Sequence, residues 1–462
     1  MLVSMAWRNL ARNLRRSVLT GAAVALGIFL ITWMRGLQDG SYDQMIDQVV
    51  RTRLGHVQVL PRGYLDRPEP AKVIPDGLSL ARRLSELDHV RAVSPRAIAE
   101  GIAARDNESA PVDLLGVDPS SEQRASVVPD RLLRGDDAER WCRDQLSDAL
   151  ELMGGDDELF GRWCAATRAS RYLADDDARA VVLGVGLAKQ LLVGVGDEVT
   201  VQVVRAVAAD GADRGEGGEA GALSQRRLEV VGLVRTGNPE VDDQVAYVPL
   251  DVLTAMLGTA GPNELVILLD DLDNLEEVRA AAAGVVGPDS SSEVTAWYQR
   301  NPALRSLIEV DSRSGALVYV ILFVLVALGV INTTLMSVLE RTHEFGVMLA
   351  LGARRGMVFA LVMTEVALLG VISLVVGCSL GALIETFGRV HGWPLEWFGY
   401  DAEAMGDASM AGVVYDPIYY ANLTTTNAIV IVVGVYAMFL FAGLLPAIKA
   451  ARLAPVDAMR RR

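Results

Sequence analysis

The chain has 462 residues, 51% of them hydrophobic, and a formal net charge of −15 at neutral pH. A chain of this length can bury a sizeable core. It also holds four long stretches with no charge or a single charge. Because about 20 apolar residues suffice to cross a bilayer, each stretch is a candidate membrane span. The acidic balance argues against nucleic acid as a partner, because phosphate binding needs clustered positive charge.

An interfacial amphipathic helix is expected over residues 1–16. Val3, Trp7, Leu10 and Leu14 recur at three- and four-residue spacing, while arginines occupy the opposite face. Such a helix lies in the headgroup plane with its apolar stripe toward the acyl chains. The alternative is a plain charged anchor ahead of the first membrane span.

Residues 17–54 are predicted to form the first transmembrane helix and a helical stalk, because apolar residues continue at helical spacing beyond the uncharged stretch. A cleaved signal peptide is the alternative, but its apolar core is usually shorter, and no small-x-small cleavage site precedes Arg35. The remaining spans are expected at 303–339 (with a second stalk), 357–384 and 427–448.

A mixed α+β domain is predicted for residues 55–302, because short strand signals alternate with helical ones. Strands are expected at 56–60, 112–117, 181–183, 199–204, 228–233, 246–248 and 265–269, and helices at 78–87, 185–192, 250–257 and 272–286. Two interruptions are an acidic helical insert at 136–178 and a glycine-rich stretch at 207–223, which is expected to be a mobile hairpin tip.

The insert contains the tripeptide Arg-Trp-Cys twice, ending at Cys142 and Cys164. Folding the insert as a helical hairpin brings these cysteines to the same level. Outside the cytoplasm oxidation is permitted, which favours a disulfide. The alternative is a pair of buried thiols whose tryptophan neighbours pack in the core.

Basic residues predict the orientation of the chain. The pieces before the first span, between the second and third spans and after the fourth carry +9 together, whereas the whole chain carries −15, so the remainder carries −24. The positive-inside rule then places both termini, the turn at 340–356 and the tail at 449–462 in the cytoplasm. The large domain and the loop at 385–426 then lie outside the cytoplasm.

No catalytic constellation is visible in the sequence. The four histidines fall on separate segments without metal-ligand spacing, and no glycine-rich phosphate loop ends in Lys-Ser or Lys-Thr. We therefore expect no enzymatic activity and no bound cofactor. Glu365, about eight residues into the third span, is an intramembrane carboxylate and so a functional candidate. Two roles stay open for it: coupled proton movement, or a structural bond to a neighbouring helix.

Three segments together resemble FtsX-type ABC transporter permeases: AWRNLARNLRRSVLT (6–20), ERTHEFGVMLALGARRGMVFALVMTE (340–365) and LLPAIKAARLAPVDAMR (444–460). Within that family, DGSYDQMIDQVVRTRLGHVQVL (39–60) is similar to the lipoprotein-releasing branch, the LolC and LolE type. Permeases of the MacB type share the topology but typically carry a fused ATPase. The resemblance therefore implies four transmembrane helices in a bacterial inner membrane, an α+β periplasmic domain and an ATPase on a separate polypeptide.

The resemblance also implies a mechanism and partners. Two permease subunits, identical or different, pair in the bilayer, and an ABC ATPase dimer that binds ATP and Mg docks on their cytoplasmic side. The segment 340–356 is the coupling helix that enters the ATPase groove. Its expected coupling residues are Glu340, Arg341, Glu344, Phe345, Gly346 and Gly352.

In the lipoprotein-releasing branch a lipid-anchored protein enters between the first and second spans and passes to a periplasmic carrier. The residues expected to line that cleft are Leu26, Phe29, Leu30, Trp33, Leu322, Val326 and Val330. The acidic 207–223 stretch and the 136–178 insert depart from the branch, which leaves carrier docking at the hairpin open. Two other functions stay open: MacB-like efflux of a small molecule or peptide, and FtsX-like regulation of a cell-wall hydrolase.

Overall fold

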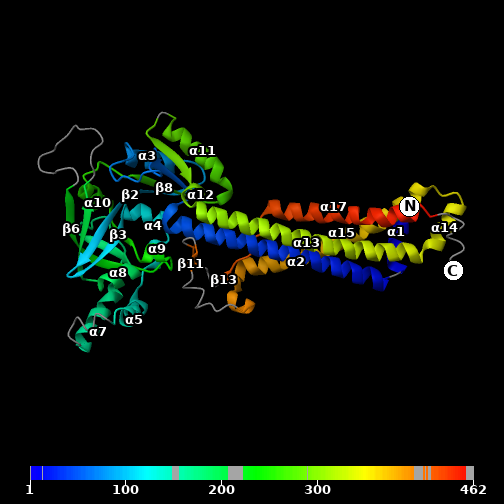
Figure 1. Ribbon diagram of the computed structural model, residues 1–462, viewed down its shortest axis with the longest axis horizontal. Coiled ribbons are helices and arrows are strands. Elements are labelled where there is room, and N and C mark those ends of the chain that lie inside the picture. The colour runs from blue at the N-terminus through cyan, green and yellow to red at the C-terminus, as the bar shows by residue number, and fades with distance from the viewer. Residues whose placement is uncertain are drawn as a thin grey trace. The chain divides into compact units, whose positions relative to one another are not determined.

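The structure is a computed structural model that divides into two units. It describes residues 2–12, 14–147, 156–205, 222–288, 290–399, 409–410, 413–414 and 418–453. A helical unit comprises Met1–Gln44, Ser306–Ala402 and Asp416–Arg462, and an α+β unit comprises Met45–Arg305 and Glu403–Tyr415. Figure 1 shows the elements of both units.

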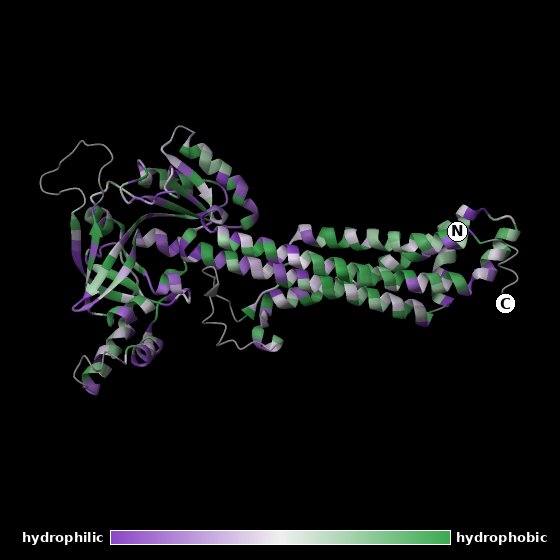
Figure 2. Cartoon of the chain, viewed as in Figure 1, coloured by the Kyte–Doolittle hydropathy of each residue, from purple (hydrophilic) through white to green (hydrophobic). Residues whose placement is uncertain are grey.

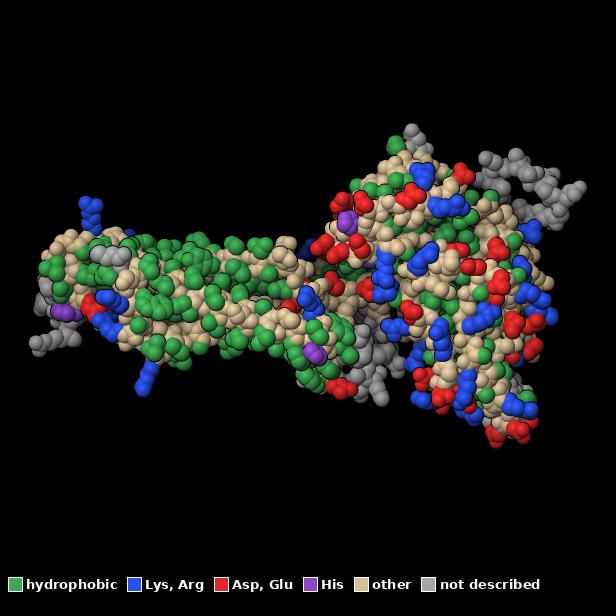
Figure 3. Space-filling model, turned by 180° about the vertical axis from the view of Figure 1, so that it is seen from behind, with side chains coloured by type: hydrophobic (Ala, Val, Ile, Leu, Met, Phe, Trp, Pro, Cys, Tyr) green, Lys and Arg blue, Asp and Glu red, His purple; other side chains and the backbone are tan. Residues whose placement is uncertain are grey.

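Four helices of the described chain are long and apolar enough to cross a bilayer. The helices of the helical unit are α1 (Leu2–Arg12), α2 (Leu14–Val49), α13 (Pro302–Glu340), α14 (Thr342–Ala350), α15 (Arg355–His391) and α17 (Thr425–Ala451). Hydrophobic residues run along their length (Figure 2), and hydrophobic side chains cover the face of the helical unit seen in Figure 3. The prediction of four transmembrane helices plus an inserted α+β domain is confirmed.

The helix ends differ from the expected boundaries. The interfacial helix ends at Arg12 and the next helix begins at Leu14, so the residues up to 16 belong to α2. Helix α2 is followed directly by a π-helical turn at Val50–Leu54, so helical structure reaches the end of the expected range 17–54. The third span is longer than 357–384, because polar residues after 384 do not break a helix that ends only at Gly392, where φ is +68°.

The segment expected as a loop at 385–426 therefore begins with helix. It continues with a 3₁₀ turn, Leu395–Phe398, and with short strands paired as β10 (Trp393–Pro394) with β13 (Ile418–Tyr419) and β11 (Ser409–Met410) with β12 (Val413–Val414). The fourth span extends past both ends of 427–448, and its Pro446 lies within the helix.

Two apolar clusters hold the helical unit together. One joins α2, α13, α15 and α17 around Ile28 and Phe439, and the other joins α1, α13, α14, α15 and α17 around Phe345. Close approach of α15 to α2 depends on Gly377, where an added Cβ would lie 2.8 Å from the carbonyl oxygen of Ala25. Small residues at such crossings let membrane helices pack at short range.

The α+β unit is built on a nine-stranded sheet in the order β3-β7-β4-β6-β5-β2-β8-β1-β9. Its strands are β1 (Val57–Pro61), β2 (Val90–Arg105), β3 (Glu108–Val117), β4 (Ala180–Gly184), β5 (Glu198–Val204), β6 (Leu223–Val234), β7 (Val245–Pro249), β8 (Glu264–Leu269) and β9 (Ser292–Ala296). Because β2 pairs with both β3 and β5, six strands close into a ring. The pairs β3–β7 and β4–β6 are parallel.

Successive residues of the ring strands point to opposite faces of the sheet. Val181 and Leu183 enter one apolar cluster, whereas Ala180 and Val182 enter another. A third cluster lies between strands β1 and β8 and the helices α3 and α11. The helices of this unit are α3 (Gly77–Ser85), α4 (Pro119–Ala125), α5 (Gly135–Gln145), α7 (Asp157–Ala166), α8 (Val185–Leu191), α9 (Pro239–Asp242), α10 (Leu250–Leu257), α11 (Leu275–Val286) and α12 (Trp297–Arg300), with 3₁₀ turns at Val128–Arg131, Thr167–Ala169 and Leu272–Asn274.

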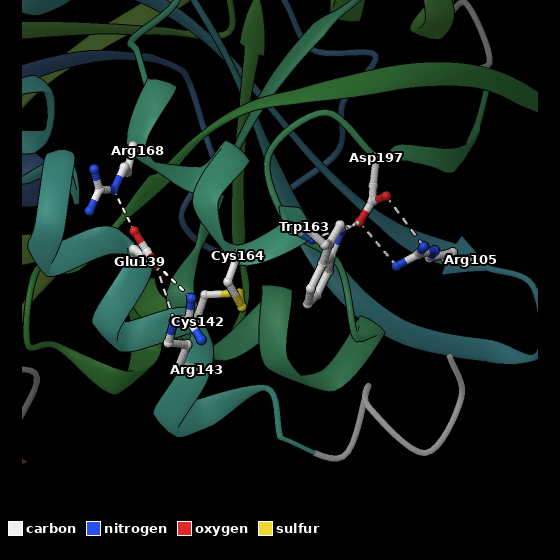
Figure 4. Close-up of a disulfide and its surroundings, with 9 residues drawn as sticks. Arg105, Glu139, Cys142, Arg143, Trp163, Cys164, Arg168 and Asp197 are labelled. Carbon is white, nitrogen blue, oxygen red and sulfur yellow. Dashed lines mark hydrogen bonds and ion pairs between the residues drawn. A yellow bond between two sulfur atoms is a disulfide. The ribbon is translucent and has the colours of Figure 1, made fainter. Parts of the chain in front are cut away.

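The insert at 136–178 contains helices α5 and α7, which a Cys142–Cys164 disulfide joins (Figure 4). The two Cα atoms are 5.4 Å apart and both residues are fully buried in the first cluster. Trp163 Nε1 donates to Asp197 Oδ2 at 2.9 Å, and Asp197 pairs with Arg105. The insert is thus anchored to the strands of its own unit. The expected hairpin tip at 207–223 lies outside the described residues, apart from its last two positions.

Candidate functional site

The helical turn between the second and third spans forms the candidate site. Helix α14 begins after Arg341, and Glu344 lies in its first turn, where a negative charge is favourable to the helix dipole. After Leu351 the chain turns at Gly352, whose φ of +90° favours glycine. The chain then enters α15, so a single short helix connects two spans.

Arg341 is the centre of a buried ion-pair network. Its Nη1 donates to both carboxylate oxygens of Glu365, at 2.7 and 2.9 Å, and its Nε donates to Glu344 Oε2 at 3.0 Å. The Arg341 and Glu365 side chains are only 8% and 13% exposed. The guanidinium also lies over the ring of Phe345, 5.0 Å from its centroid. The charges of Arg341, Glu344 and Glu365 are therefore paired within the chain.

The interfacial helix α1 joins the same network. Asn9 Nδ2 donates to Glu365 Oε1 at 2.5 Å, and Arg12 Nη2 donates to Glu344 Oε1 at 2.5 Å. Partial burial opposes the ionisation of Glu344, but the hydrogen bonds from Arg341 and Arg12 outweigh it and lower the pKa of this carboxyl. Helices α1, α14 and α15 are thus connected through charged groups as well as through the apolar cluster around Phe345.

This geometry supports one of the two roles open for Glu365. Both of its oxygens accept hydrogen bonds from Arg341, and Asn9 adds a third donor to one of them. This is the structural bond to neighbouring helices, in which the charge of the carboxylate is matched by a buried cation.

The structure places the expected coupling residues in two environments. Arg341, Phe345 and Gly346 are buried inside the helical unit, and Glu344 is half-buried between its two arginines. Glu340 and Gly352 are exposed. Arg341 and Glu344, two of the expected coupling residues, make ion pairs within the chain.

A different set of side chains forms the exposed face of this turn. His343 and Val347 lie on one side of α14, and Leu351, which directly follows the helix, continues the same four-residue spacing. All three are exposed, and Leu351 is 84% exposed. Arg354 and Arg355 follow on the exposed start of α15. The face is apolar at its centre and basic at its edge.

Sequence reasoning missed Asn9 and Arg12 as members of the site. Arg12 is expected only as one of the arginines on the polar face of the interfacial helix, and no role is predicted for Asn9. The available signal was the intramembrane Glu365, which needs a partner at its own depth. Asn9, an uncharged polar residue next to the arginines of α1, could have been recognised as such a partner.

The expected substrate cleft is not assembled as predicted. Val330 is fully buried in the helix core, and Phe29 stacks on Trp33, which contacts Trp393 edge-on. Leu322 packs against the same core. Leu26 is exposed and Leu30 is half-buried.

A groove of about 340 Å³ does run between α2 and α13, and Val326 is the member of the predicted set that lines it. The physical reason for the difference is that α2 and α13 pack against each other through part of the predicted surface.

No cluster of three or more His, Cys, Asp or Glu side chains suited to a metal occurs in the part of the chain that the structure describes.

Fold and site together define a polytopic membrane protein with an α+β domain inserted between its first two spans and an ion-paired helical turn between the next two. The chain belongs to the family of the MacB-like periplasmic core domain, which matches residues 17–285, more than half of its length. Residues 316–455 match the FtsX-like permease C-terminal domain. The chain is accordingly an ABC transporter permease of the FtsX, MacB and LolC family, with an extracytoplasmic domain.

Similar proteins carry several names. The chain is 23% identical to the macrolide export ATP-binding/permease protein MacB of Neisseria gonorrhoeae, over 96% of this chain and 58% of that protein. It is 24% identical to the lipoprotein-releasing system transmembrane protein LolC of Xylella fastidiosa, over 61% of this chain and 64% of that one. The solved periplasmic region of MacB from Actinobacillus actinomycetemcomitans aligns with a TM-score of 0.31 at 14% identity, over 53% of this chain and 90% of that one. The chain spans about half the length of the curated relatives it matches, from 33% to 64%.

Proposed function

We propose that this permease relays the motion of an ABC ATPase dimer, docked on α14, through the helical unit to the α+β unit. The observation that carries the proposal is the network around Arg341. It ties the docking turn to α15 through Glu365 and to α1 through Glu344 and Arg12. A displacement of α14 therefore pulls on α1 and α15 together. ATP and Mg belong to the ATPase partner in this proposal, and this chain supplies no catalytic group.

The exposed face of α14 is the proposed docking surface. Burying Leu351 in a partner groove removes a large apolar side chain from water, which typically stabilises a contact by about 1.5–3 kcal/mol. Arg354 at the edge adds long-range attraction to an acidic rim. The excess of basic residues at both termini and at this turn supports a cytoplasmic location for the docking surface.

Two chain connections support transmission toward the α+β unit. The two units meet within continuous helix at residues 44–45, inside α2, and at 305–306, inside α13. A helix passes axial displacement along its length better than a flexible linker does. The proposed relay therefore runs from α14 into α13 and α15, and along α2 and α13 to the extracytoplasmic domain.

The docking proposal is tested with the purified ATPase and the intact permease in nanodiscs. Leu351→Asp should weaken ATPase binding at least tenfold, whereas Leu351→Met should bind like the parent protein. Glu344→Lys should keep ATPase binding and ATP hydrolysis but lose substrate movement, since it breaks the links to Arg12 and Arg341. Equal binding by the two Leu351 variants would contradict the docking surface.

For the substrate we favour a lipid-anchored protein released from the membrane. In the most apolar window of α13, 6% of the residues are buried, against 22–33% in the other three spans. Side chains such as Leu317, Ile321 and Leu328 leave an apolar face that suits acyl chains. The similarity to LolC, whose name describes lipoprotein release, agrees with this substrate.

Efflux is the second candidate, favoured by matches to macrolide export proteins that cover 96–99% of the chain. Reconstitution with the ATPase, a labelled lipoprotein and a soluble carrier separates the two. ATP-dependent transfer of the lipoprotein to the carrier supports the first candidate. ATP hydrolysis that is stimulated by a small hydrophobic compound but releases no lipoprotein supports the second.

A further inference from the structure

An apolar groove of about 350 Å³ lies within the helical unit, where α1, the start of α2 and the middle of α15 meet. Its walls include Trp7 and Leu10 from α1, Val18 and Ala22 from α2, and Ile372 and Val376 from α15. This groove is separate from the α2–α13 groove and from the ion-pair network. The small residues of α2 keep it open.

One buried polar atom faces into this groove without a partner. Ser373 lines the groove and is only 1% exposed, and its Oγ has no hydrogen-bond partner in the described part of the chain. A Cβ placed on Gly21, on the facing wall, would lie 3.5 Å from that oxygen. A serine in a helix can bond to the carbonyl four residues earlier, and such a bond is not made here. The hydroxyl is therefore available to an oxygen of a bound molecule.

Positive charge lies at one end of the groove. The first acidic residue of the chain is Asp39, whereas the segment before the first span carries four arginines. Arg12 is held by Glu344, but Arg15 is exposed and makes no ion pair with a described residue. Arg15 stands three residues before Val18 and so shares the α2 face that lines the groove. Anionic lipid headgroups are attracted to such cations.

We propose that the groove is a binding site for one anionic phospholipid. The phosphate contacts Arg15, an acyl chain fills the apolar walls, and an ester oxygen near the glycerol accepts a hydrogen bond from Ser373 Oγ. Gly21 lies six positions after Arg15 in α2, which is a rise of about 9 Å. That rise matches the distance in a phospholipid from its phosphate to the start of its acyl chains.

Two features of the groove favour an anionic phospholipid as its occupant. An arginine without a described carboxylate partner selects negative charge over a zwitterionic headgroup. A buried hydroxyl inside apolar walls selects a molecule with both hydrocarbon and an acceptor oxygen. A transmembrane helix of a second copy would fill the walls but would bring no negative charge to Arg15.

Native mass spectrometry of the intact chain in detergent, with added phosphatidylglycerol or phosphatidylcholine, tests the site. Val376→Trp fills the groove, and Val375→Trp places the same side chain on the neighbouring exposed position outside it. We expect the parent chain to retain one phosphatidylglycerol. The retained amount should fall at least tenfold in Val376→Trp and stay unchanged in Val375→Trp. Arg15→Gln should weaken phosphatidylglycerol roughly fivefold and leave phosphatidylcholine unchanged.

Three outcomes would overturn the site. Equal retention of the two lipids by the parent chain would remove the headgroup preference. Equal loss in the two tryptophan variants, with helix content preserved by circular dichroism, would remove the groove. A Val376→Trp variant that retains lipid but no longer pairs with a second copy would assign the groove to a subunit interface.

Discussion

Replacing Glu365 with Gln removes the negative charge that faces Arg341 while keeping the shape of the side chain. The atoms of the pair lie 2.7 and 2.9 Å apart, and both side chains are largely buried. At an effective dielectric constant near 20, two unit charges 2.7 Å apart attract by roughly 6 kcal/mol before the cost of desolvation. Removing one partner of a buried pair typically costs about 3–5 kcal/mol. Because Glu344 remains bonded to the guanidinium, we expect a loss near the lower end, about 3 kcal/mol.

A double-mutant cycle measures the pair itself. Arg341→Met, Glu365→Gln and the double variant are compared by the free energy of unfolding in detergent micelles. We expect each single variant to cost about 3 kcal/mol and the double variant about 4 kcal/mol, which gives a coupling energy of about 2 kcal/mol in magnitude. The exposed pair Arg313 and Glu309 on α13, 3.3 Å apart, serves as the control cycle and should couple by less than about 1 kcal/mol. Additivity of the two buried substitutions within about 0.5 kcal/mol would refute the reasoning.

Three further predictions concern stability. Replacing Cys142 and Cys164 with Ala should lower the free energy of unfolding of the α+β unit by about 3 kcal/mol, because the disulfide closes a loop of roughly 23 residues. Denaturant titration measures this loss. An unchanged free energy of unfolding would mean that the disulfide adds no stability. His56 accepts a hydrogen bond from the Leu269 N–H, and burial lowers its pKa from 6.5 to about 4, so stability should be complete above pH 6.5 and fall by about 2 kcal/mol at pH 5. His56→Asn should flatten that pH profile, and an unchanged profile would contradict the assignment. Gly377→Val should destabilise the helical unit by about 2 kcal/mol and lower its thermal midpoint, whereas the same change at Gly329, which has open space around it, should not.

The spans and most strands could be predicted from the sequence because their signals are local. Uncharged stretches identify helices that cross a bilayer, and runs of Val and Leu identify strands such as β8. Strand β2 could not be found this way. Its residues Val90–Arg105 are rich in alanine and contain Pro95 and Gly101, so local propensity opposes a strand. Its pairing with β3, β5 and β8 is a tertiary effect that overrides propensity.

The candidate site was predictable in its location but not in its side-chain directions. The turn at 340–356 could be found from its charges and glycines. That Arg341 points inward depends on Glu365, which is 24 residues away, and on Asn9, which is 356 residues from Glu365. Contacts between residues this far apart in the chain leave no periodic signal. The same holds for the predicted cleft, since periodicity cannot separate a lipid-facing leucine from one that packs on a neighbouring helix.

The relay from the ATPase to the α+β unit is tested most directly by distance measurement during nucleotide binding. A spin label is attached at Arg227→Cys, an exposed position on β6, and Cys378→Ser removes the free thiol that would also react. The distance between the labels of two permease copies in the reconstituted complex is then measured by pulsed electron paramagnetic resonance. The relay predicts that ATP shifts this distance in the parent protein and leaves it unchanged in Glu344→Lys, although that variant still hydrolyses ATP. A distance that ignores ATP in the parent protein, or that shifts equally in Glu344→Lys, would contradict it.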